Sequence, residues 1–246
     1  MIDAATTAWP EVAAALRDGI AILPFGAFEQ HGPHLPLSTD TIVAEHVARA
    51  IAEQLDAVLL PPVNYGQTWN NAGYPGTMSL SAATVVAVAT DIANAVAFAS
   101  AKAFVIVNGD WGNRVPLASA AAALSNDVLP TLVLDYPGMD SAASLLRESA
   151  EPIAGYALDH AGELETSTML HIAPGLVRST READGYAEFP PGFESEPTQL
   201  HPFSASGVFG DPTVANAEKG ARILAATIDA SRAVIDEFLS RLPSSL

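Results

Sequence analysis

Short aliphatic runs alternate with long helical patterns along this chain, and the alternation limits the folds that it can adopt. The order strand, helix, strand, helix is typical of βαβ units and predicts an α/β fold with a mostly parallel central sheet. Strands in such a sheet need helices on both faces. The strand-like runs are residues 21–25, 57–60, 104–107 and 131–134, and the helical patterns between them are 41–55, 82–100 and 115–124.

Length and helix-start signals indicate how the chain is organised. A chain of 246 residues with no repeat and no linker suits one domain, and we expect it to cover residues 1–246. Ser81 precedes an apolar periodic run and can cap a helix. Asp211-Pro212 predicts the start of the last helix, which we expect to run to about Leu242.

Charge and residue usage exclude several classes of partner and site. The formal net charge is -17, from 11 basic and 28 acidic residues, so the surface should repel phosphate backbones and anionic lipids; we expect no nucleic-acid or membrane partner. The absence of cysteine excludes disulfides and thiolate chemistry, so any metal must be held by oxygen and imidazole ligands. No signal-peptide pattern and no long apolar span is present, which makes the cytoplasm the expected location.

Polar residues gather after two of the predicted strands. Residues 26–40 follow the first strand, and residues 108–113 follow the third. Ligands of open α/β sheets bind beyond the carboxyl ends of the strands. Both segments carry carboxylates and the first carries two histidines, so we expect a functional site there.

The first segment has the spacing of a metal site. Glu29 and His31 are two residues apart, so an extended chain would point both side chains to the same side. Asp40 comes just before a helical pattern and could bridge two ions. An N-cap aspartate and a surface histidine would explain the same spacing.

Two further segments carry acids and a histidine. Asp110 follows a buried strand in N-G-D-W-G-N, where a ligand would sit, but a turn aspartate bonding local N–H groups is the alternative. His160, Glu163 and Glu165 crowd a helix start, where capping and the helix dipole explain carboxylates equally well. Glu163 and Glu165 diverge on a helix, so at most one of them should face a metal.

Together these segments resemble the creatininase (creatinine amidohydrolase) family. E-Q-H-G-P-H-L-P-L-S-T-D is similar to the family signature. N-G-D-W-G-N is similar to its N-G-H-G-G-N or N-G-H-Y-E-N segment, and H-A-G-E-L-E-T-S to its H-A-G-x-x-E-T-S segment. G-V-F-G-D-P-T near the end also has a counterpart. The matches keep the family order from about residue 20 to the last helix, and their combination is specific.

The resemblance implies a three-layer αβα sandwich, a binuclear metal site and hydrolysis of a C–N bond in an amide, often a cyclic one. By this resemblance Glu29 binds one metal, His31 binds the other and Asp40 bridges them. A metal-activated hydroxide would attack the amide carbonyl, and His160 would protonate the leaving nitrogen. The resemblance also implies a homo-oligomer, often a hexamer.

The segment after the third strand departs from the family pattern. Asp110 stands where the family usually has a ligand histidine, and Gly112 stands where creatininase itself has a ligand glutamate. Glu165 is then expected to supply the missing bond. Two divalent ions (Mn, Fe or Zn) are implied, and a set with four carboxylates favours Mn or Fe over Zn on ligand hardness. The alternative is that one metal is lost.

Three functions compete on these observations. The leading hypothesis is a hydrolase of a small-molecule amide or lactam, with a pocket shaped by Trp111, Trp69 and Asn71, although Trp111 could equally pack in the core. The second is a peptidase similar to the family member that trims the mycofactocin precursor, with a groove beside a long loop predicted over residues 179–206. The third is a degenerate member that only binds, and the aspartate at position 110 is its sole support.

Overall fold

The computed structural model describes residues 1–135, 159–178 and 198–242, and everything below concerns these ranges. Most of the loop predicted over residues 179–206 lies outside them. Among the described helices, none combines the length and the apolar character needed to cross a membrane.

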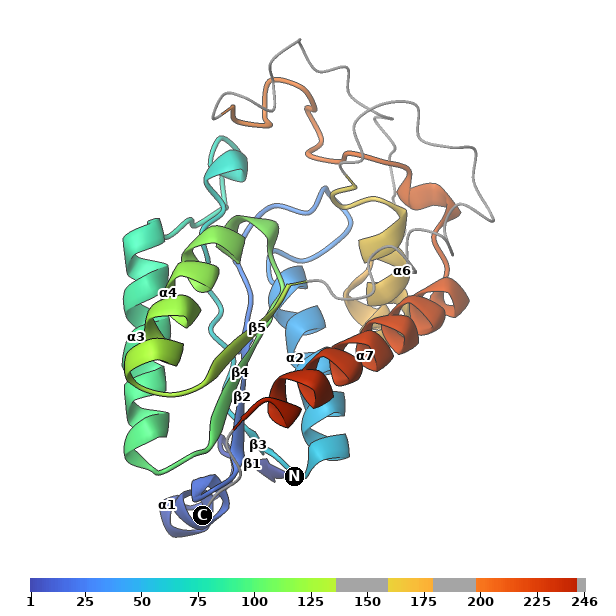
Figure 1. Cartoon of the computed structure of the whole chain (residues 1–246). Coiled ribbons are helices and arrows are strands. Elements are labelled where there is room, and N and C mark those ends of the chain that lie inside the picture. The colour runs from blue at the N-terminus through green and yellow to red at the C-terminus, as the bar shows by residue number, and fades with distance from the viewer. Residues whose placement is uncertain (136–158, 179–197, 243–246) are drawn as a thin grey trace.

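A parallel sheet of five strands lies at the centre of the described structure (Figure 1). All neighbouring strands pair in parallel, and every residue of β2 and β4 is buried. Aliphatic and aromatic side chains fill these two central strands because both of their faces are covered. The strand order is β1 (Ile2–Asp3), β3 (Val58–Leu59), β2 (Ile20–Phe25), β4 (Ala103–Asn108) and β5 (Thr131–Asp135).

Helices cover the two faces of the sheet and build two hydrophobic cores (Figure 1). Alternation along β2 divides its side chains, so Leu23 and Phe25 join one core while Ile20 and Ile22 join the other. This arrangement confirms the three-layer αβα sandwich. The first face carries α1 (Trp9–Leu16), α3 (Ala82–Phe98) and α4 (Arg114–Asp127). The second face carries α2 (Thr39–Leu55) and α7 (Ala217–Ser240), and α6 (Glu163–Ile172) packs against these two helices.

The predicted elements are confirmed with shifted ends, and one helix start is wrong. Ser81 caps α3 by accepting a hydrogen bond from the N–H of Thr84. The side chain of Asp211 instead caps a single 3-10 turn, Pro212–Val214, after which Ala215 is extended. The long helix α7 begins only at Ala217, where the side chain of Asn216 accepts from the N–H of Lys219.

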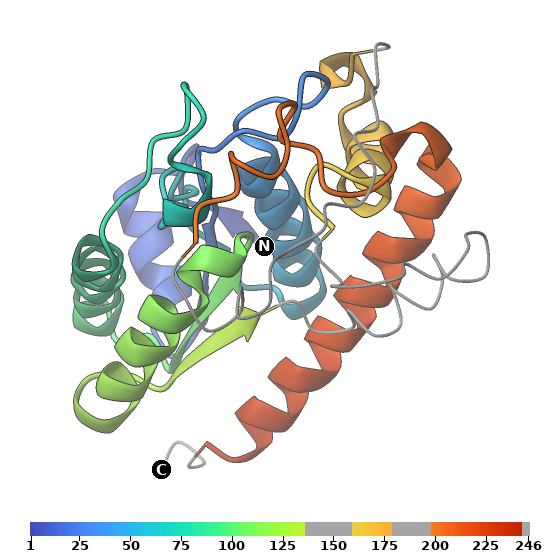
Figure 2. The ribbon, with the colours of Figure 1, turned by 90° about the horizontal axis from the view of Figure 1, so that it is seen from above.

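Two glycines at the carboxyl ends of the central strands let helix α2 approach the sheet closely. A Cβ at Gly26 would lie 2.2 Å from the hydroxyl oxygen of Thr41, and a Cβ at Gly109 would lie 2.4 Å from the main-chain oxygen of Asp40. A side chain at either position would therefore displace the first turn of α2. The glycines bring the first turn of α2, which carries Asp40, against the ends of β2 and β4. Seen from above, several loops converge at this end of the structure (Figure 2).

Candidate metal centre

Four separate stretches of chain bring the candidate ligands to the carboxyl ends of β2 and β4. The loop after β2 carries Glu29 and His31, and the first turn of α2 carries Asp40. Asp110 follows β4 directly, and Glu165 lies in the first turn of α6. The strand order reverses between β2 and β4, and such a switch point is the usual ligand site of open α/β sheets.

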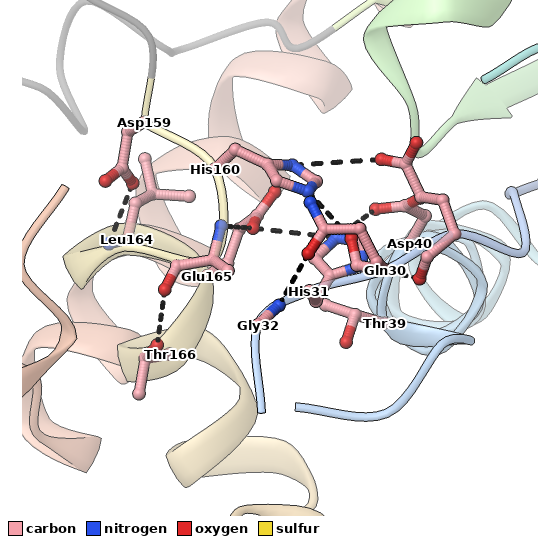
Figure 3. A network of polar contacts seen from close by, with 12 residues as sticks. Gln30, His31, Gly32, Thr39, Asp40, Asp159, His160, Leu164, Glu165 and Thr166 are labelled. Atoms are coloured by element: carbon pink, nitrogen blue, oxygen red, sulfur yellow. Dashed lines mark hydrogen bonds and ion pairs between the residues drawn. The ribbon is translucent and has the colours of Figure 1, made fainter. Parts of the chain in front are cut away.

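Among the described residues, three sets of donor atoms are compact enough for a cation. Glu29, His31 and His160 form one set, and the other two, called the first and second triads below, share Asp40. In the first triad, Nε2 of His31 lies 3.0 Å from Oδ1 of Asp40 and 3.6 Å from Oε2 of Glu165 (Figure 3). In the second triad, donor oxygens of Glu29, Asp40 and Asp110 all lie within 4.8 Å of one another. The same limit holds for the first triad, so each is compact enough for one cation, with Asp40 between them.

Unsatisfied buried atoms indicate what the cluster lacks. Oδ2 of Asp40 and Oδ2 of Asp110 are buried and have no hydrogen-bond partner, and Nε2 of His31 is buried with the carboxylates of Asp40 and Glu165 beside it. Nδ1 of His31 contacts the main-chain oxygen of Glu29 at 3.2 Å, an arrangement that directs Nε2 toward the carboxylates. Buried polar atoms without partners are costly, and divalent cations held by the two triads would satisfy all three. The residues present therefore fit a metal.

The pKa values of the candidate ligands are shifted by burial and by the charges of their neighbours. Burial, followed by repulsion from neighbouring carboxylates, raises the pKa values of Glu29 and Asp110 well above their usual range. Burial also raises the pKa of Asp40, although His31 partly offsets it. Burial opposes charge on His31, but Asp40 and Glu165 outweigh it and raise its pKa. The cluster therefore holds several buried carboxyl groups and one imidazole, and it lacks enough positive charge to balance the carboxylates.

His160 lies at the edge of the cluster as a neutral imidazole. Its Nε2 is 2.8 Å from the main-chain oxygen of Gln30, and its Nδ1 is 3.8 Å from Oε1 of Glu29. Burial, aided by the nearby charge of His31, lowers the pKa of His160 to about 4. Nδ2 of Asn71 also lies 3.4 Å from the same Nε2, but the carbonyl is nearer and only accepts, so we assign the proton to Nε2, and the lone pair of Nδ1 then faces Glu29.

The structure also places the predicted pocket residues and the second glutamate of the α6 start. Trp111 is 54% exposed, which excludes the core-packing alternative, and its ring lies 5.9 Å from the guanidinium of Arg114. Trp69 is half-buried in a 3-10 turn, while Asn71 is buried and its amide bonds Glu29. Glu163 turns away from the cluster and pairs with Lys219, so of the two neighbouring glutamates only Glu165 faces the other ligands.

Sequence reasoning missed two polar residues beside the site. Gln30 is buried between Glu29 and His31, and its side chain bonds to Asn71 and Gly207 in two other segments and to Gly32 in its own loop. Asp159 accepts a hydrogen bond from the N–H of Leu164 at the start of α6, and burial together with the charge of Glu165 raises its pKa to about 7. Their positions beside motif residues were the only signal.

The fold and the donor set define a metal-binding hydrolase, and comparison with known proteins agrees. A family model described as creatinine amidohydrolase matches residues 5–235, so the chain belongs to the creatininase family of amidohydrolases, which act on C–N bonds. It is 35% identical over 220 residues to the mycofactocin precursor peptide peptidase of Mycolicibacterium smegmatis, covering 85% of this chain and 81% of that protein. It is 29% identical over 247 residues to the creatinine amidohydrolase of Pseudomonas putida, covering 94% and 95%.

Solved creatininase structures share the whole architecture. A crystal structure of creatininase superposes with a TM-score of 0.87 at 25% identity and covers 99% of both chains. A manganese form of creatininase gives 0.84 at 27% identity and covers 99% of both chains. A mutant creatininase described as of the Zn–Zn type gives 0.85 at 26% identity and covers 98% of both.

Proposed function

We propose that this chain is a binuclear metal-dependent amidohydrolase that cleaves the amide or lactam bond of a small molecule. The observation that carries the proposal is the shared position of Asp40, whose buried carboxylate belongs to both the first and the second triad. A carboxylate between two cation positions is the arrangement used to clamp a substrate between two metals. Relatives with creatininase and peptidase names support C–N hydrolysis as the reaction class.

The two triads divide the ligands between two cations. His31, Asp40 and Glu165 would hold one, and Glu29, Asp40 and Asp110 would hold the other. Bound there, divalent ions supply Lewis acidity that lowers the pKa of a water molecule and polarises an amide carbonyl. Mn, Fe and Zn all suit carboxylate and imidazole donors, and the surplus of oxygen ligands favours Mn or Fe.

His160 is the residue that moves a proton. Because Gln30 holds the proton on Nε2, the lone pair of Nδ1 is directed toward Glu29 and can take a proton from the attacking water. The same atom then delivers that proton to the leaving nitrogen, which is a poor leaving group without it. The low pKa of His160 keeps it unprotonated before reaction and makes its protonated form a strong acid.

Exposed aromatic surface near the ligands supports a substrate pocket. Trp111 follows the ligand Asp110 directly and presents much of its ring to solvent, and Trp69 lies in the turn that carries Asn71. We assign substrate contact to the two tryptophans. Asn71 has its amide committed to Glu29 and Gln30, so its role is better explained as support for Glu29.

A peptidase is the second candidate, and one observation favours it. The relative from Mycolicibacterium smegmatis, which shares 35% identity over most of both chains, is a peptide peptidase. The degenerate binding protein is less well supported, because Asp110 keeps its carboxylate in the second triad. We further propose a single domain over residues 1–246, a cytoplasmic location and a homo-oligomer, for which a hexamer is the first arrangement to test.

Metal content and substrate choice test the proposal together. Protein purified without chelators should contain about two equivalents of Mn, Fe or Zn per chain by elemental analysis. The loaded protein is then assayed against small lactams, linear amides and short peptides. Turnover of lactams or small amides supports the first candidate, and turnover of peptides alone supports the second. A chain that takes up no metal on dialysis overturns both.

A further inference from the structure

A directed series of hydrogen bonds connects a main-chain N–H group to the Glu29 carboxylate. Gly32 donates its N–H to Oε1 of Gln30 at 2.9 Å. Nε2 of Gln30 donates to Oδ1 of Asn71 at 3.0 Å, and Nδ2 of Asn71 donates to Oε2 of Glu29 at 2.9 Å. Gln30, Asn71 and Glu29 are all buried, so water does not compete for these bonds. We call this series the Gln30–Asn71 chain.

Main-chain groups determine the direction of the Gln30–Asn71 chain. The N–H of Gly32 can only donate, so it requires the oxygen of the Gln30 amide. The carbonyl of Gly207 can only accept, and it lies 3.0 Å from the nitrogen of the same amide. With Gln30 oriented from both ends, Asn71 must present its oxygen to Gln30 and its nitrogen to Glu29.

The consequence for Glu29 is that its two oxygens have different roles. Oε2 accepts from Asn71, while Oε1 faces Nδ1 of His160. The bond from Asn71 therefore fixes the orientation of the Glu29 carboxylate and leaves its other oxygen on the side of His160.

Gln30 acts on His160 as well, through its main chain. Its carbonyl accepts from Nε2 of His160, which leaves Nδ1 without a proton. Its side chain also leaves no space at Gly207, where a Cβ would lie 1.9 Å from Oε1 of Gln30, and Gly207 has a φ of 82°. One residue thus controls the orientation of a ligand, the tautomer of the proton carrier and the approach of residues 204–208.

We propose that Gln30 and Asn71 are positioning residues that preset Glu29 for metal binding and His160 for proton transfer. The inference rests on the proposed function, because it assigns them to the same metal-dependent reaction. Partners of this kind hold metal ligands in the binding geometry, and their loss typically costs about 10–100-fold in metal affinity.

A double-mutant cycle on metal affinity tests the side-chain part. Metal-free native protein, Gln30→Met, Asn71→Ala and the double variant are titrated with Zn²⁺ and with Mn²⁺ against a competing chelator. Circular dichroism checks the fold, and Gln54→Met on the exposed side of α2 is the control. Each single change should weaken metal binding by about 10–100-fold. The double variant should bind metal as well as the single variant with the lower affinity, because both changes interrupt the same series of hydrogen bonds. Native-like affinity in a folded Gln30→Met variant, or additive losses, overturns the inference.

An isosteric change covers the case in which Gln30→Met does not fold. Gln30→Glu keeps the shape of the side chain, but its ionised carboxylate has no proton to donate and repels the acceptor oxygens of Asn71 and Gly207. Its loss of metal affinity relative to native should therefore shrink as pH falls and the new acid gains a proton, while Gln54→Glu shows no such trend. A loss that does not change with pH contradicts the directed chain.

Imidazole nitrogen NMR tests the His160 part without any metal. Metal-free native protein should show His160 protonated at Nε2 near neutral pH, and protonation at Nδ1 instead would overturn this part. The design separates the two proposals: native protein that takes up no metal defeats the proposed function, whereas metal uptake that is insensitive to Gln30 and Asn71 defeats only this inference.

Discussion

Nε2 of His31 lies 3.0 Å from Oδ1 of Asp40, although His31 belongs to a loop and Asp40 to the first turn of a helix. The contact exists because Gly26 and Gly109 allow that helix to rest on the ends of two strands. Asp40 also reaches Glu29 and Asp110 on its other side. Its carboxylate is therefore the one group common to both halves of the metal centre.

Removing that shared carboxylate should empty both positions. Asp40→Ala is expected to reduce bound metal from about two equivalents per chain to near zero, because each triad loses a donor. Elemental analysis after dialysis against Mn²⁺ or Zn²⁺ measures this. Asp91→Ala, at an exposed position of α3, is the control and should keep the native content. Retention of both equivalents in Asp40→Ala would show that the ions lie elsewhere.

Asp110 and Glu165 should each matter to one position only. Asp110→Ala and Glu165→Ala are each expected to leave about one tightly held equivalent, since the two residues belong to different triads. Native mass spectrometry separates species with one and two ions. If Asp110→Ala keeps both ions with native affinity, Asp110 is not a ligand.

Replacing the proton carrier should separate binding from turnover. His160→Gln is expected to keep about two metal equivalents while kcat on the amide substrate falls by about 10²–10⁴-fold, which is the usual contribution of a general acid–base group. Activity should recover partly on substrates with better leaving groups, because they need less protonation. A loss of metal in His160→Gln would instead make His160 a ligand, as its place beside Glu29 and His31 permits.

A glutamate at position 112, which the family resemblance implies for creatininase itself, should not fit here. A Cβ at Gly112 would lie 1.8 Å from the main-chain oxygen of Gln67, which Asn113 holds in place through the N–H of that residue. Gly112→Ala should lower the free energy of unfolding by about 1–3 kcal/mol, the usual cost of overpacking. Urea denaturation measures it, with Gly175→Ala as the control because a Cβ there meets nothing within 4 Å. Equal stabilities would contradict the close packing.

Asp159 should make stability depend on pH. Its pKa of about 7 in the folded chain lies above the value of about 3.9 for an unfolded aspartate. The stabilisation from its folded-state proton is therefore complete below about pH 4 and is lost as the pH rises through about 7. Metal-free Asp159→Asn should thus gain about 2–4 kcal/mol relative to native between pH 4 and 8. Urea denaturation across that range measures the difference, with Asp91→Asn as the baseline; a constant difference would contradict the shift.

The central fold could be read from the sequence because its signals are local. β2 and β4 are continuous aliphatic runs, and Ser81 caps α3 as its position predicts. Elements with weak local signals were missed: β1 has only two residues, and α1 begins after Ala8, which has no capping side chain. The start of α7 was misplaced because an aspartate followed by proline suits a 3-10 turn as well as an α-helix.

The candidate site was only partly predictable for a related reason. Spacing and family resemblance were enough to select Glu29, His31 and Asp40, which the structure brings together. The relation of Gln30 to Gly207 was not accessible, since it connects residues 177 positions apart through a main-chain carbonyl. Asn71 could be assigned to the neighbourhood of the site but not to its hydrogen-bond partner. Such roles depend on tertiary contacts that no local pattern encodes.

The position of Glu165 on α6 gives the metal centre a mechanical role. The chain has no cysteine, so no disulfide can tie α6 to the rest of the protein. A cation held jointly by Glu165, by Asp40 on α2 and by the β2 loop would serve as a removable cross-link between elements distant in sequence. Chelation would then loosen α6 from its neighbours before the sheet is disturbed, so catalytic competence and the anchoring of this helix would be gained and lost together.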